Sequence, residues 1–138
     1  MDDSVLIRLL TAHRAIAHEL LELAQREQQA LSNNNTSILQ EIGARRKDLL
    51  PHLEESLDNL RHHRINWQNL DVVSRQHPPE VRALLTQTQD CIMRILLLDR
   101  QNEKELLRLG LGPGGATGPD SQPRAHFVAD LYRRQNRA

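Results

Sequence analysis

Aromatic side chains, cysteine and net charge are all scarce in this chain of 138 residues. It has one Trp, one Tyr, one Phe and a single cysteine, Cys91, so no disulfide can form within the chain. The 18 basic and 18 acidic residues cancel, which leaves no overall field to draw the protein to nucleic acid or to an anionic membrane. No apolar run approaches the roughly 18 residues of a membrane span, and no signal peptide is evident, so a cytoplasmic protein is expected.

Motifs of catalysis, cofactor binding and metal binding are missing too. The sequence has no phosphate-binding loop, dinucleotide fingerprint, zinc-binding spacing or nucleophile elbow. None of the seven histidines follows a Glu by three residues, the spacing that a di-iron bundle uses. His62 and His63 are adjacent, and adjacent helical side chains point about 100° apart, so they are poorly placed to share an ion. We therefore expect no enzyme, no cofactor and no metal, with His13, His18, His62 and His63 at surface, edge or half-buried positions.

Leucine, by contrast, is abundant. The 24 Leu, 7 Ile and 5 Val stand among many Arg, Glu and Gln, all good helix formers. Apolar residues at spacings of three and four predict long amphipathic helices over about residues 3–33, 36–64 and 79–109. The expected fold class is all-α, an antiparallel, coiled-coil-like bundle of three main helices with a flexible C-terminal tail that can form a short helix. Polar residues interrupt the stripes at Glu27, Arg46 and Asn102, and Asn102 is expected to fix helix register.

The connections between these helices differ in kind. The run SNNNTS favours a tight turn. Pro51 lies inside the second helix and predicts either a kink near Leu50 or a new helix start. Residues 65–78 end in His-Pro-Pro and predict a long connection with room for one short helix, from which Trp67 is expected to cover one end of the bundle.

Glycine and proline mark the end of the helical domain. Five of the six glycines and three of the six prolines fall between residues 110 and 123. This composition predicts a flexible linker over 110–123 between a helical bundle domain, 1–109, and an amphipathic tail, 124–138.

The tail has a helical pattern of its own. Phe127, Val128, Leu131 and Tyr132 would gather on one side of a helix. An isolated helix this short is marginal in water, so the tail must dock, either on its own bundle or on another protein. We assign these four residues to partner binding, and the alternative of docking on the bundle stays open.

Two stretches carry a resemblance to a known family. ELLELAQREQQALSNNNTSILQEIGARRKDLLPHLEE resembles the core of FlgN-type flagellar export chaperones, in which an acidic Leu-rich helix meets a short polar turn and then a helix with a Lys before a Leu pair. DRQNEKELLRLGL is similar to the family's third helix. The matching positions are Glu27, Leu31, Lys47, Leu49, Leu50 and Asn102. The resemblance covers about residues 5–110.

The resemblance implies a small cytosolic helical chaperone of flagellar type III secretion. Such proteins bind terminal segments of hook-associated subunits, which form the hook-filament junction, keep them unassembled and deliver them to the export gate at the membrane. Family members also contact that gate through a C-terminal region with a tyrosine, and Tyr132 is the only tyrosine here. The residues alone leave an alternative, a generic coiled-coil adaptor that homodimerises and has no tie to secretion.

Overall fold

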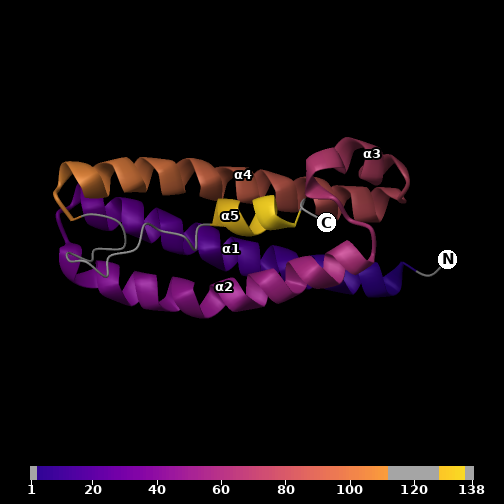
Figure 1. Ribbon diagram of the computed structural model, residues 1–138, viewed down its shortest axis with the longest axis horizontal. Helices are drawn as coiled ribbons and strands as arrows, with labels where there is room; N and C mark the ends of the chain where they lie inside the picture. Colours follow the sequence, from indigo (N-terminus) through magenta and orange to yellow (C-terminus); the bar gives the residue numbers. More distant parts are fainter. Residues whose placement is uncertain (1–2, 112–127, 136–138) are drawn as a thin grey trace.

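The computed structural model describes residues 3–111 and 128–135, and Figure 1 shows long helices lying side by side. The predicted all-α class is confirmed, because the described residues form helices and turns and contain no strand. Of the three long helices, the first two are joined by a 3-10 turn, the second and third by a 3-10 turn and a short helix, and one more short helix lies beyond the third. In chain order the elements are α1 (Ser4–Ser32), η1 (Thr36–Ile38), α2 (Leu39–His62), η2 (Trp67–Asn69), α3 (Leu70–Arg75), α4 (Pro79–Arg108) and α5 (Val128–Arg134). Over this part of the chain no helix is long and apolar enough to cross a membrane.

Helix α1 is the element on which the bundle is built. It packs against both α2 and α4. In Figure 1 the chain runs from right to left along α1, back from left to right along α2, and again from right to left along α4, so α4 is parallel to α1 and α2 is antiparallel to both. The turn after α1 includes Asn34 at a φ of 56°, a left-handed conformation that Asn tolerates. Two apolar clusters form the core. One joins the middle of the long helices to α5, and the other joins the start of α1, the end of α2, α3 and the start of α4.

Helix α2 passes through Pro51 without interruption, so the predicted alternative of a new helix start there is wrong. Pro51 lacks the N–H that would donate to the Lys47 carbonyl, and both residues are exposed. On the opposite side Leu50 and Leu53 are buried. Packing of that side holds both halves of the helix on the core.

The connection over residues 65–78 is largely helical. The Asn66 side-chain oxygen accepts a hydrogen bond from the Gln68 backbone N–H at 2.9 Å, which starts η2. Leu70 and Val73 are buried in the second apolar cluster. The segment therefore covers one end of the bundle with α3, and Pro79 begins α4 as its first residue.

A buried polar layer crosses the bundle away from α3. The Arg46 guanidinium donates to the Asp99 carboxylate, and both side chains are less than a tenth exposed. Asn102 donates to the Ala24 carbonyl of α1 at 3.0 Å, and Glu27 is buried as well. The desolvation of a buried ion pair offsets most of its Coulomb attraction, so this layer contributes register more than stability.

We expect Asp99→Ala to lower the free energy of unfolding by about 3–5 kcal/mol, because it leaves the Arg46 charge buried without its partner. The double variant Arg46→Met, Asp99→Leu should recover most of that loss. Urea unfolding followed by far-UV circular dichroism measures both effects. The exposed pair of Arg45 and Glu19 supplies the control, since Glu19→Ala should hardly move the midpoint. Equal losses at the two pairs would contradict the prediction.

Candidate functional site: the groove that holds α5

Helix α5 lies between α2 and α4 and contacts both (Figure 1). Val128, Leu131 and Tyr132 are all buried there. The structure thus brings three of the four residues assigned to partner binding onto the protein's own bundle, while Phe127 lies outside the described residues. These side chains are accessible to a partner only when α5 leaves.

The surface under α5 is an apolar groove supplied by all three long helices. The buried cluster that α5 joins includes Ala17 of α1, Leu53 and Leu57 of α2, and Cys91 and Ile95 of α4. Cys91 is buried, and this burial raises the pKa of its thiol, so it behaves as a small apolar residue, as the sequence predicted. An amphipathic helix is the shape that such a groove accommodates.

One polar group, His13 of α1, is buried in this apolar setting. Its Nε2 is hydrogen-bonded to the Tyr132 hydroxyl at 2.6 Å, and its Nδ1 to the Ser56 hydroxyl at 2.8 Å. The imidazole stacks on Trp67 with ring centroids 5.5 Å apart, and Trp67 meets the Tyr132 ring edge-on at 5.8 Å. Three other segments of the chain, α2, η2 and α5, therefore converge on His13.

The charge state of this cluster follows from burial. Loss of water lowers the pKa of His13 to about 4, and its three close partners, Ser56, Trp67 and Tyr132, are all uncharged. At neutral pH the ring therefore donates one hydrogen bond and accepts the other, and both hydroxyl partners can take either role. Burial also raises the pKa of Tyr132 well above its ordinary value, so its hydroxyl stays protonated.

Charged and polar groups lie along the rim of the groove. Arg134 is 3.9 Å from the Glu54 carboxylate, and Gln135 donates to the Asp58 carboxylate at 2.9 Å. Glu54 and Asp58 are one helical turn apart on α2, so the α2 rim is acidic where α5 is basic and polar.

Two opposing contributions to the docking of α5 are of the same order. Three buried apolar side chains contribute about 1.5–3 kcal/mol each. Ordering the seven residues of the helix costs about 1–2 kcal/mol per residue, which is a total of the same order. A longer helix with more apolar contact could therefore displace α5.

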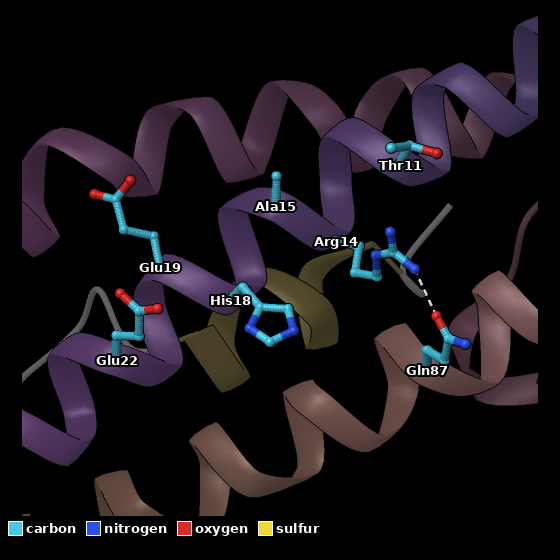
Figure 2. Close-up of a pocket in the computed structure, with 7 residues that line it drawn as sticks. All are labelled: Thr11, Arg14, Ala15, His18, Glu19, Glu22 and Gln87. Atoms are coloured by element: carbon cyan, nitrogen blue, oxygen red, sulfur yellow. Dashed lines mark hydrogen bonds between the residues drawn. The ribbon is translucent and has the colours of Figure 1, made fainter.

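The surface away from this groove offers weaker evidence of a binding site. A depression between α1 and α4 is lined by Arg14, His18, Glu19, Glu22 and Gln87, among others. In Figure 2 Arg14 points to Gln87, with which it is hydrogen-bonded, whereas Glu19 and Glu22 point away from it, so the charges do not converge on a ligand. Within the part of the chain that the structure describes, no three His, Cys, Asp or Glu side chains are grouped to hold a metal.

Sequence reasoning found the apolar side of the tail but missed the residue that α5 contacts most specifically. His13 falls on the apolar stripe of α1 between Leu10 and Ala17, and this position was the available signal that it is buried. The expectation of a surface, edge or half-buried histidine was wrong for His13. Trp67 is half-buried beside His13 and packs against both apolar clusters, so it does more than cover one end.

Comparison with known proteins gives no relative to argue from: no family model, no curated protein and no solved structure matches this chain.

The lowered pKa of His13 predicts acid destabilisation. The unfolded chain takes up a proton near the ordinary pKa of 6.5 and the folded chain only near 4, so stability is complete above 6.5 and is lost as the pH falls. By pH 5 the loss should reach about 2 kcal/mol. Urea unfolding at pH 7.5 and pH 5 measures it. His13→Gln should flatten this dependence, whereas the exposed control His18→Gln should keep it; equal pH slopes in all three proteins would refute the prediction.

The contact between Tyr132 and His13 predicts that the tail contributes to stability. Tyr132→Phe leaves one His13 nitrogen buried without its partner, which should cost about 1–3 kcal/mol and release α5 from the groove. Trp67, the only tryptophan, reports the release, because its emission should shift to the red as the covering ring leaves. Arg133→Ala, at an exposed position of α5, is the control and should leave the spectrum unchanged. If Tyr132→Phe has the emission spectrum and the unfolding midpoint of the wild-type protein, the hydroxyl does not hold α5 in the groove.

Proposed function

We propose that this protein is a chaperone that holds an amphipathic helix of a client in the groove occupied by α5. The observation that carries the proposal is the groove itself. Helices α1, α2 and α4 offer a continuous apolar surface, and a helix of only seven residues covers it, with opposing contributions from burial and ordering that are of the same order. Masking a helix requires packing surface and no catalytic group, so the protein acts by binding and not as an enzyme.

The FlgN-type resemblance supplies the class of client. Terminal segments of hook-associated flagellar subunits coil only on assembly, and before assembly they present amphipathic helices that need covering. We propose that the protein binds these segments in the cytoplasm, keeps them unassembled and delivers them to the flagellar type III export gate.

Burial of Tyr132 means that a client must bind before the tail can contact the gate. In the isolated protein the tyrosine is 7% exposed, which hides it from any gate component. A client helix that enters the groove expels α5 and exposes Tyr132 together with Leu131. Under this proposal the gate meets the tail only after a client has bound.

Copurification from a flagellated host tests the proposal. We expect the tagged chain to enrich hook-associated junction subunits, and the Val128→Asp, Leu131→Asp variant to enrich more of them, because it frees the groove from α5. Leu97→Asp, at a leucine of α4 that is 58% exposed, is the matched control and should capture as much as wild type. If mass spectrometry finds no junction subunit in any of the three samples, the chaperone proposal fails. A tight homodimer in light scattering, insensitive to added junction subunit, would favour a homodimerising adaptor instead.

A further inference from the structure

His13, together with the Ser56 hydroxyl beside it, places hydrogen-bonding groups in a groove whose other buried residues are apolar. A helix that fills the groove with carbon alone would leave the Nε2 atom without a partner and away from water. Such a group destabilises a complex more than a well-formed hydrogen bond stabilises one. The groove therefore discriminates against helices that match it only in shape.

Helix α5 shows what a matching helix carries. Val128 and Leu131 supply apolar contacts, Tyr132 brings its hydroxyl to His13, and Arg134 and Gln135 meet the acidic rim of α2. The pattern starts with an apolar residue and has a second apolar residue three positions later, followed directly by a hydroxyl-bearing aromatic. A cation stands two positions after the aromatic, and a hydrogen-bond donor follows the cation. Each of these positions contacts a complementary group of the groove: the apolar cluster, His13, Glu54 or Asp58.

We propose that His13 is a specificity-determining residue, which selects partner helices that place a hydroxyl-bearing side chain over its imidazole, while the rim favours a cation near Glu54 and a hydrogen-bond donor near Asp58. This inference rests on the proposed function, since it takes the groove of α5 as the client site. The occupant is a helix of another protein with this pattern and with more apolar contact than α5 has. The α5 of a second copy would gain no contact over the tethered α5, which binds at a high effective concentration.

Peptide binding to the full chain tests the selectivity. The probe is a fluorescein-labelled peptide with the sequence of residues 124–138, RAHFVADLYRRQNRA, measured by fluorescence anisotropy. The host is the full chain with Val128→Asp and Leu131→Asp, which frees the groove while the long helices keep their sequence. If that variant does not fold, the wild-type chain with a larger excess of peptide gives the same ranking by competition with its own α5.

We expect the peptide in which Phe replaces the tyrosine to bind this host about tenfold more weakly. On the same host with His13→Leu this preference should vanish or reverse, because there the tyrosine hydroxyl is the group left without its partner, whereas the Phe peptide places carbon against carbon. On the rim, a peptide with Glu in place of Arg134 should bind more weakly. The matched peptide with Glu in place of Arg133, whose side chain lies near Asp130 of α5 itself, should bind almost as the parent does.

The same preference for the tyrosine peptide on hosts with and without His13 would overturn the inference, as would equal binding of both peptides to the host with His13. A wild-type dimer in light scattering that Tyr132→Phe converts to monomer would also overturn it, by making a second copy the occupant. The outcome is separable from that of the proposed function. Selective peptide binding with no junction subunit in the copurification would keep the role of His13 and reject the flagellar client.

Discussion

The structure depends on one constraint: α1 packs against two long helices at once, and the apolar surface between α2 and α4 then needs a cover. A three-helix bundle with leucine-rich faces wider than the helix contacts leaves such a strip open to water. Over the described residues α5 provides the cover, with Val128 fully buried. The need to fill this groove explains why the chain keeps an aromatic residue beyond its last long helix, and it makes the same surface suitable for a helix from elsewhere.

The long helices could be read from the sequence because their apolar periodicity is local. Spacings of three and four predicted three helices whose bounds lie within three residues of α1, α2 and α4. Pro51 was harder, since a proline argues against a helix interior, yet the buried side chains around it outweigh that local preference. The helical character of residues 67–75 was also underestimated, because burial of Leu70 and Val73 against the bundle stabilises a segment whose own pattern is short.

The contacts that form the site could not be predicted from local sequence patterns. The hydrogen bond between His13 and Tyr132 joins residues 119 positions apart, and no periodicity relates α1 to a short helix at the other end of the chain. Asp99 illustrates the same limit: its position gave no sign of a partner, although Arg46 had been noted as a polar residue on an apolar stripe. In both pairs one member, His13 or Arg46, is a polar residue on an apolar stripe of the sequence. Its partner, Tyr132 or Asp99, can be identified only from the folded structure. Polar interruptions of an apolar stripe are thus the residues to follow when a helical bundle carries no catalytic motif.

The two buried polar contacts differ in what holds their second member. Arg46 and Asp99 lie on α2 and α4, which stay packed on α1 as long as the protein is folded, so their pairing fixes register permanently. Tyr132 lies on α5, a helix of seven residues, and under the proposed function a client side chain replaces it as the partner of His13 while the long helices stay packed. The cost of burying a polar group is similar in kind at both places. Between the long helices the buried polar pair specifies one structure, whereas opposite α5, under the proposed function, the buried histidine specifies which helices the groove accepts.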